Sequence, residues 1–490
     1  MSYQGLADFL EELGQAGELV RVDAEVDPVL EAAEVTNRIA SSGGPALIFG
    51  SVRGHDLPLL TNLLGTEERV CRALGVHSLT ELSQKVDELV RPQNSDAWYE
   101  RLKTAPTRAG LSKLPPHSVK TGPCQQVVRL AGDVDLGSLP ALQSRPDEPG
   151  PTITAGQVFT VDPDCRHPVV GRYDLAVLDR DRLAVCWGPH EPAARLPVEY
   201  GRRNEQVPLA VVLGGDPAGL LAAMAPLPAE ADVRALAGLL RGKPLEMVAC
   251  RSVDLEVPAD AEIVIEGFVD PAESPANVGP LCGPTGYYTH QRPAPVIRVT
   301  AITHRTNPIY PAIVPGEPPH EACVIHRALQ QVFLPLVKQA IEELVDCDLP
   351  AFGTGRHWAL VSIRKNYAGQ ARQVALRIWG LPWLMFSKLM VIVDEDVDVH
   401  DHDQVWSAVA ANFDPGRDVV FHQGPPDPWD PAAVGGTLGN RMAIDATTKL
   451  TGESTGKRCE KAAMSEEIRR LVGGRWSEYG LGPEPGAAKP

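Results

Sequence analysis

Hydrophobic positions near the N-terminus recur with the spacing of amphipathic helices. Residues 5–14 and 27–41 place apolar side chains three or four positions apart, so two helices are predicted there. The apolar runs PALIFG (45–50) and LPLLTNLLG (57–65) lie on either side of a short polar turn and indicate buried strands. This mixture predicts an N-terminal α/β domain over residues 1–115.

Between residues 116 and 315 the pattern changes to many short runs rich in Val, Ile and Thr. Pro, Gly or Asp interrupts these runs at short intervals, as in TITAGQVFTV, LAVLDRDRLAVCW, AEIVIEGFV and VIRVTAITHR. Short strands in such number predict a β-barrel or sandwich, with one helical interruption near 217–241.

A helical pattern returns at 321–346, and the runs WALVSIRK and KLMVIVDEDVDV then read as buried strands with helices between them. A C-terminal α/β domain is therefore expected over residues 316–475, followed by a disordered tail over 476–490. The acidic run DEDVDVHDHD (394–403) is typical of a solvated turn at a strand end, and a metal site is the alternative interpretation.

The charge of the chain excludes some classes of partner. A formal net charge of −17 offers no general basic surface, so neither nucleic acid nor an anionic membrane is an expected partner. The acidic, amphipathic N-terminus does not resemble a signal peptide, and a cytoplasmic location is expected. The nine cysteines are scattered without a C-x-x-C spacing, which indicates free thiols.

One loop stands out by composition. The stretch NVGPLCGPTGYYTH (277–290) is rich in Gly and Pro and contains no acidic residue. Such a stiff segment with few side chains predicts close approach of its backbone to another group.

Motifs along nearly the whole chain are similar, in one order, to those of the UbiD family of decarboxylases, whose members use prenylated FMN and a divalent metal. The similar segments are PDEPGPTITAG, GGDPAGLLAAMAPLP, AGLLRGKPLEMV, DLEVPADAEIVIEGFVDP, GPTGYYT, VTAITHRTNPIYPA, SIRKNYAGQAR, VIVDEDVDVHD and MAIDATTK. The resemblance implies an N-terminal α/β domain, a central split β-barrel of the flavin-reductase type, a C-terminal α/β oligomerisation domain and a symmetric oligomer.

Several positions depart from the family pattern. The family segment N-x-G-x-Y-R supplies an Asn metal ligand and a catalytic Arg, but VVGRYD has Val169 and Asp174 at these positions. Val233 stands where the family has a metal-binding Glu, and valine cannot coordinate a hard cation. In the loop, the two catalytic Glu positions correspond to Val278, or Asn277 if the gap is placed differently, and to Gly283.

Three positions retain the family pattern. The resemblance implies that His190 contacts metal and flavin, that Thr154 lines the cofactor, and that Lys388 meets the flavin phosphate. One imidazole is a weak metal site, because three protein ligands are usual. We therefore expect no metal site and weak or lost binding of prenylated FMN and manganese.

The remaining ionisable candidates suggest altered chemistry. Asp174, His190, Cys282 and Tyr287 are the predicted catalytic residues, because a carboxyl group in a newly apolar cavity has its pKa raised toward general-acid values. The alternatives are an ion pair of Asp174 with Arg172, a packed small Cys282 thiol, and a structural His190.

Three functions stay open from the sequence. The first is an enzyme derived from the decarboxylase scaffold, a carboxy-lyase acting on an unsaturated or aromatic carboxylic acid in bacterial secondary or quinone biosynthesis. The second is a non-catalytic subunit or scaffold that partners an active UbiD paralogue, since symmetric oligomers make such a partner plausible. The third is an ordinary decarboxylase that depends on prenylated FMN. A homo-oligomer, a dimer or larger, is expected, and a UbiD paralogue is the alternative partner.

Overall fold

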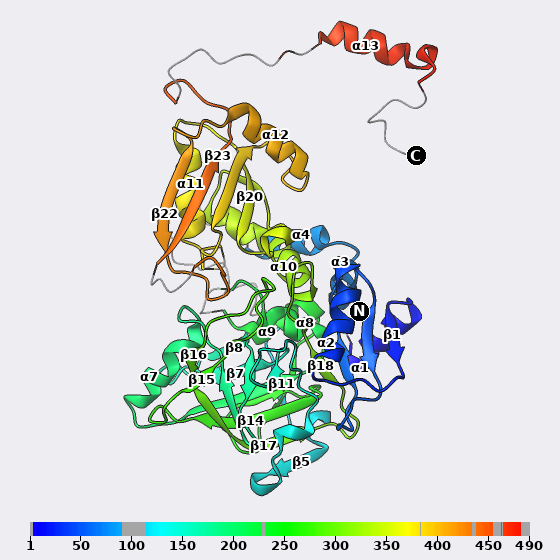
Figure 1. Ribbon diagram of the computed structural model, residues 1–490, viewed down its shortest axis with the longest axis vertical. Coiled ribbons are helices and arrows are strands. Elements are labelled where there is room, and N and C mark those ends of the chain that lie inside the picture. The colour runs from blue at the N-terminus through cyan, green and yellow to red at the C-terminus, as the bar shows by residue number, and fades with distance from the viewer. Residues whose placement is uncertain are drawn as a thin grey trace.

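The computed structural model describes residues 3–90, 114–227, 231–382, 384–433, 438–453, 462 and 464–481. Three domains follow one another along the chain (Figure 1). The central β-rich domain lies at the bottom of the view, the N-terminal domain at its right, and the C-terminal α/β domain above. The predicted three-domain architecture of α/β and β domains is confirmed.

The N-terminal domain is a four-stranded sheet, in the order β1-β2-β3-β18, with helices against both faces. Alternate residues of β2 explain this arrangement: Ala46 and Ile48 join the core beside α1, whereas Leu47 and Phe49 join the core beside α2. The elements are α1 (Leu6–Gln15), β1 (Leu19–Val22), α2 (Glu31–Ser41), β2 (Ala46–Phe49), β3 (Leu59–Thr61), α3 (Glu67–Ala73), α4 (Leu79–Val90) and, from later in the chain, β18 (Tyr310–Ala312).

The helix predicted over 27–41 begins only at Glu31. The Asp27 carboxylate accepts a hydrogen bond from the Val29 N–H at 2.8 Å and forms a turn where the first helical turn was expected.

The central domain is a curled, wholly antiparallel nine-stranded sheet, in the order β6-β9-β10-β17-β14-β11-β7-β8, with β5 also paired to β17. Its strands are β5 (Val127–Leu130), β6 (Thr152–Ile153), β7 (Gln157–Val161), β8 (Pro168–Arg172), β9 (Leu175–Val177), β10 (Arg182–Val185), β11 (Val207–Leu213), β14 (Ile263–Val269) and β17 (Val296–His304). Around it lie α7 (Leu196–Gly201), α8 (Pro217–Ala223), α9 (Val233–Arg241), the small sheet β4 (His117–Val119), β12 (Glu246–Ala249) and β13 (Glu256–Pro258), and the hairpin β15 (Ala276–Val278) and β16 (Arg292–Ala294). The single helical interruption predicted near 217–241 is two helices, because Pro226 cannot continue the first one.

The C-terminal domain is a mixed five-stranded sheet in the order β19-β20-β21-β23-β22. Helix α11 packs on one face with Val374 and Ile378, and α12 packs on the other with Val405. The elements are α10 (Glu321–Ala340), β19 (Leu344–Asp348), β20 (Trp358–Ile363), α11 (Gln370–Trp379), β21 (Leu389–Asp394), α12 (His402–Asn412), β22 (Val419–Gly424) and β23 (Gly439–Asp445). The helix predicted over 321–346 is too long, because its last residues form β19 and pair with β20.

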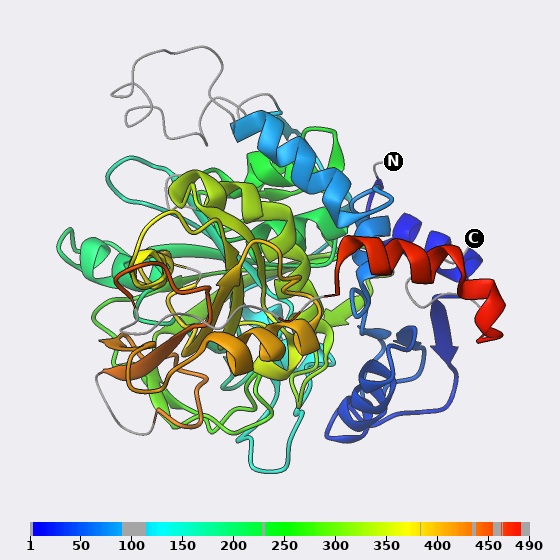
Figure 2. The same ribbon diagram turned by 90° about the horizontal axis from the view of Figure 1, so that it is seen from above.

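Helix α10 joins the domains. Its residues Ile325 and Val332 lie in a core shared with α1, α3, α4, α8 and α9, whereas Leu334 and Val337 lie in the core of the C-terminal domain. At its first turn, the buried Glu321 carboxylate accepts the Leu64 N–H at 2.7 Å and ties the helix to the N-terminal domain. Figure 2, seen from above, shows α10 crossing the middle of the molecule beside α4.

The C-terminal helix α13 (Glu466–Gly474) stands apart from the three domains in Figure 1, and it has no buried residue. Within the expected disordered tail, Trp476–Tyr479 form a short 3-10 turn, and residues 482–490 lie outside the described residues. In the described parts of the chain, no helix combines the length and apolar character required to cross a membrane.

We expect Ile325→Ala to destabilise the protein strongly, because the side chain is fully buried at the point where α10 meets the shared core. A deletion of this kind in a core costs about 2–5 kcal/mol. Thermal unfolding followed by circular dichroism should show a lowered midpoint. The matched change Leu376→Ala, at a half-exposed position of α11, should leave the midpoint nearly unchanged, and equal losses in both variants would contradict this view of α10.

Candidate active site

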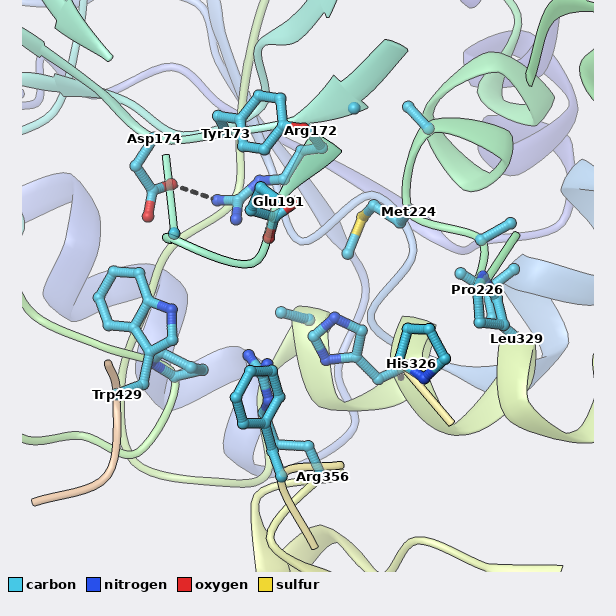
Figure 3. Close-up of a pocket in the computed structure, with 18 of the residues that line it drawn as sticks. Arg172, Tyr173, Asp174, Glu191, Met224, Pro226, His326, Leu329, Arg356 and Trp429 are labelled. Atoms are coloured by element: carbon cyan, nitrogen blue, oxygen red, sulfur yellow. Dashed lines mark hydrogen bonds and ion pairs between the residues drawn. The ribbon is translucent and has the colours of Figure 1, made fainter. Parts of the chain in front are cut away.

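A cavity of about 490 Å³ lies between the central sheet and the C-terminal domain. This volume is within the range of small-molecule sites. Its walls come from β8, the segment after β10, the ends of α8 and α9, the loop around Cys282, β16, α10 and three loops of the C-terminal domain. Figure 3 shows Asp174 and Trp429 at one end of the cavity and Pro226 and Leu329 at the other. The cavity is therefore polar at one end and apolar at the other.

Arg172 and Asp174 form an ion pair at the polar end. They are two residues apart at the end of β8, where extended backbone places alternate side chains on one face. Their Nη2 and Oδ1 atoms are 2.5 Å apart, and Arg172 Nε also donates to the Thr154 carbonyl at 2.7 Å (Figure 3). Asp174 thus has a guanidinium partner, as the ion-pair alternative for this residue anticipates.

A second ion pair comes from the C-terminal domain. Asp427 Oδ2 lies 3.0 Å from Arg356 Nε and 2.9 Å from His357 Nε2. Burial opposes ionisation of Asp427, but Arg356 and His357 outweigh it and lower the pKa to about 2. Asp427 is therefore ionised and balances the Arg356 charge.

Arg292 on β16 differs from the other two cavity arginines. Its guanidinium carbon lies 5.4 Å from the centroid of the Trp429 ring, and one nitrogen approaches the Cys186 carbonyl at 3.5 Å. In the described residues it has no carboxylate partner. A guanidinium stacked on an aromatic face keeps its edge free for an anion, so Arg292 is a candidate anion ligand.

Glu191 faces the same cavity beside His190, and its Oε1 lies 3.7 Å from His190 Nε2. Burial raises the pKa of Glu191, against the opposing effects of Arg356, the Tyr173 hydroxyl and Arg172. Burial and the nearby Arg356 lower the pKa of His190. Both shifts favour the uncharged forms: the Glu191 carboxyl group keeps its proton to a higher pH than usual, and the His190 imidazole loses its proton at a lower pH than usual.

The cavity brings together three of the four predicted catalytic residues: Asp174, His190 and Cys282. Burial raises the pKa of the Cys282 thiol to about 11, so the thiolate needed for nucleophilic attack is scarce at neutral pH. Tyr287 lies outside the cavity lining and is 64% exposed.

Only one of the three residues expected to contact a flavin lies in the wall of the cavity. His190 lines the cavity and packs edge-on against Phe386, with ring centroids 4.6 Å apart. Thr154 and Lys388 do not line it: the Thr154 hydroxyl accepts the Ile313 N–H at 3.1 Å, and Lys388 Nζ pairs with Asp430 Oδ1 at 2.7 Å.

The structure places the residues at which the family resemblance implies metal ligands and catalytic carboxylates as follows. Val169 and Val233 line the cavity, whereas Val278 is 2% exposed in a small cluster behind it. A Cβ at Gly283 would lie 2.6 Å from Trp429 Cε3, so the indole fills the space of a side chain there. Over the described residues, no group of three or more His, Cys, Asp or Glu side chains is arranged to hold a metal ion. This donor set does not fit a divalent cation.

Sequence reasoning missed Glu191, Arg292, Arg356, His326 and Trp429. Glu191 alone had a signal, because it follows His190 directly in WGPHEP. The others come from a strand, a helix and loops far apart in the chain, and only the packing of the domains assembles them.

Three domain families match the chain in order. The 3-octaprenyl-4-hydroxybenzoate carboxy-lyase N-terminal domain matches residues 10–89, the Rift-related domain matches 117–318, and the C-terminal domain matches 323–446. The class is therefore that of the three-domain carboxy-lyases. The chain belongs to the UbiD family.

Relatives support this assignment over the full length. The chain is 39% identical over 482 residues to an uncharacterized protein of Aquifex aeolicus (strain VF5), which covers 98% of this chain and 99% of that protein. The closed form of vanillic acid decarboxylase from Sedimentibacter hydroxybenzoicus is similar with a TM-score of 0.86, 26% identity, and coverage of 98% of this chain and 100% of that one. The UbiD-class enzyme HmfF from Pelotomaculum thermopropionicum in complex with FMN gives a TM-score of 0.77, 29% identity, and coverage of 95% and 98%.

We expect Gly283→Ala to lower stability by about 1–3 kcal/mol, the usual cost of overpacking, because the new methyl group would clash with the Trp429 ring. Adding Trp429→Ala should recover part of this loss, so a double-mutant cycle by thermal unfolding should give a clear coupling energy. Gly14→Ala on α1, where nothing lies within 4 Å, is the matched control and should not destabilise. Additive losses in the cycle would show that Trp429 does not fill this space.

Proposed function

We propose that the protein is a decarboxylase-type lyase that acts on an unsaturated or aromatic carboxylic acid with a non-standard, cofactor-poor active site. The pathway we propose is bacterial secondary or quinone biosynthesis in the cytoplasm. The observation that carries the proposal is one cavity that holds Arg292, which has no carboxylate partner among the described residues, and Glu191, a partly buried carboxyl group of raised pKa. Protonation of a carboxylic acid at carbon can use both groups, the first to hold the carboxylate and the second to donate the proton.

Charge balance favours an anionic substrate. Arg172 is paired with Asp174 and Arg356 with Asp427, while burial lowers the pKa of the cavity histidines His190, His320 and His326 and keeps them neutral. When Glu191 is protonated, the charge of Arg292 is left unbalanced. A bound carboxylate supplies the missing negative charge, and the apolar end of the cavity receives the carbon skeleton.

The proposed reaction is protonation at carbon followed by loss of CO₂. Arg292 holds the substrate carboxylate, and protonated Glu191 donates its proton to the carbon that carries this carboxylate. The bond from that carbon to the carboxylate then breaks and CO₂ leaves. The electron pair of this bond restores the double bond or the aromaticity of the ring. Glu191 remains as a carboxylate and regains a proton from water.

The resemblance implies prenylated FMN and manganese as cofactors, and structures of the relative HmfF contain FMN and, in an evolved dimeric form, prenylated FMN. We propose that this chain binds them weakly or not at all. The valines at 169 and 233, the indole beside Gly283 and the ion pair of Lys388 support this proposal. No step above is routed through a cofactor.

We also propose a homo-oligomer. The exposed apolar residues Ile468 and Leu471 on α13, which contacts no core, favour assembly with another subunit. A UbiD paralogue as that subunit is the scaffold alternative.

Protein co-expressed with the prenyltransferase that makes prenylated FMN is expected to purify without a stoichiometric flavin absorbance band and without stoichiometric manganese. The reason is that the ligand positions carry aliphatic side chains, which offer no oxygen donors. Absorbance spectroscopy and metal analysis of the full-length protein measure both. A flavin band with one manganese per chain would restore the ordinary decarboxylase mechanism.

Glu191→Gln should reduce decarboxylation at least 100-fold, because the amide keeps the volume but cannot donate the proton. CO₂ release from a panel of aromatic and unsaturated acids is the assay. In the wild type, kcat/KM should fall as pH rises through the elevated pKa of Glu191, since only the protonated carboxyl group acts. The charged and titratable groups around it, which shape this profile, are Arg172, Tyr173, His190, Arg356 and Asp427.

The matched control is Glu273→Gln, which removes an ion pair with Arg298 on the surface of the central domain and should leave the rate unchanged. Loss of activity in Asp174→Asn but not in Glu191→Gln would make Asp174 the proton donor. Activity only after addition of a co-purifying paralogue would favour the scaffold function.

A further inference from the structure

A second, much smaller cavity lies behind the polar end of the first. Its volume is about 10 Å³, close to the smallest that admits one water molecule. Asp174 and Cys282 line both cavities, so the two share a wall. Carboxyl and hydroxyl groups in the wall of the small cavity come from Ser144, Glu148, Thr152, Thr154 and Asp174.

The Thr152 hydroxyl is the unusual group in this wall. Thr152 is 6% exposed, and its Oγ1 atom is buried without a hydrogen-bond partner among the described residues. Thr152 and Thr154 line the small cavity, whereas Ile153 between them joins the hydrophobic core, as alternate side chains of an extended segment do. A buried hydroxyl group without a partner costs about 1–3 kcal/mol, so its retention points to a ligand.

Two neighbours of Thr152 have hydrogen-bonding capacity to spare. Thr154 Oγ1 accepts the Ile313 N–H at 3.1 Å, which leaves the hydrogen of its hydroxyl group free to donate. Asp174 Oδ1 meets Arg172 Nη2 at 2.5 Å, and the described residues form no hydrogen bond with Asp174 Oδ2. The small cavity therefore combines two hydroxyl groups with one carboxylate oxygen.

The carboxylates in the wall already have partners, which disfavours a bound cation. Arg172 balances the charge of Asp174. The Glu148 oxygens accept the N–H groups of Ser144 and Cys282 at 2.6 and 2.9 Å. The same carboxylates repel an anion, so a neutral ligand of this size is favoured.

We propose that the small cavity is the binding site of one water molecule, held by the hydroxyl groups of Thr152 and Thr154 and by the Asp174 carboxylate. Water can accept hydrogen bonds from both hydroxyl groups and donate one to Asp174 Oδ2. Three partners are the usual number for a buried water molecule.

The water closes a ring of hydrogen bonds around the ion pair of Arg172 and Asp174, which Figure 3 shows. Arg172 Nε donates to the Thr154 carbonyl at 2.7 Å, and the water links Asp174 Oδ2 to the Thr154 hydroxyl. Both members of the pair are then anchored to Thr154, so Asp174 does not turn away and release Arg172. In the proposed function this leaves Arg292 for the substrate carboxylate, but the water site itself does not depend on that function.

Thr152→Val tests the site by stability, because valine keeps the shape of the side chain and the Thr152 hydroxyl has no other partner. Its loss deprives the water of a ligand, so the midpoint of thermal unfolding of the full-length protein should fall. Thr303→Val is the matched control: the Thr303 hydroxyl on β17 is also buried without a partner but lines neither cavity. Its removal should raise the midpoint. The two replacements should thus act in opposite directions.

Crystal structures that resolve ordered water locate the ligand directly. The wild type should show one peak of density within hydrogen-bonding distance of Thr152 Oγ1, Thr154 Oγ1 and Asp174 Oδ2. Thr152→Ser, which keeps the hydroxyl group, should retain the peak, and Thr152→Val should lack it. In Thr152→Val the Asp174 side chain should also leave its single position beside Arg172.

Unfolding in KCl, NaCl and choline chloride at equal concentration distinguishes water from a monovalent cation. Equal midpoints are expected. A gain with K⁺ or Na⁺ that disappears in Thr152→Val would identify a cation and overturn the water site.

The inference also fails if Thr152→Val raises the midpoint as Thr303→Val does, or if the wild type shows no density at the site. Failure of the proposed function gives a different result. In that case the wild type releases CO₂ from no acid, while the water and its dependence on Thr152 remain as predicted.

Discussion

The burial of α10 in two hydrophobic cores is the constraint on which the active site depends. Its first half packs with helices of the N-terminal and central domains, and its second half packs into the C-terminal domain. The helix therefore sets how the C-terminal loops that carry Arg356, Asp427 and Trp429 face the end of β8.

The cavity lies within the three-domain frame of the family, and its lining departs from the family pattern at the positions compared above. In the loop of residues 277–290, the backbone at Gly283 lies against the Trp429 ring, which fills the space that a side chain would occupy. Valines stand at two lining positions where the family resemblance implies metal ligands. Four charged groups in its wall form two ion pairs, Arg172 with Asp174 and Arg356 with Asp427, and the proposed function assigns the substrate to Arg292 and Glu191. In the proposed function, guanidinium binding and proton transfer take the place of metal coordination.

The sequence predicted the domain order well because hydrophobic periodicity is a local property. The strands PALIFG, WALVSIRK and KLMVIVDEDVDV appear where expected, since buried strands need continuous apolar runs. Boundaries were less accurate. Local hydrogen bonding by Asp27 delays α2, Pro226 divides one predicted helix into two, and pairing with β20 converts the end of another into β19.

The sequence by itself determined the family, the three domains and the aliphatic residues at 169, 233 and 278, because each of these follows from residue identity at a motif position. Only the tertiary structure decided which ionisable groups act together. It pairs Asp174 with Arg172, leaves Tyr287 at the surface, and brings Glu191, Arg292 and His326 from three separate segments to one cavity. The physical reason is that pKa, pairing and burial depend on neighbours distant in the chain, and no local pattern encodes those neighbours.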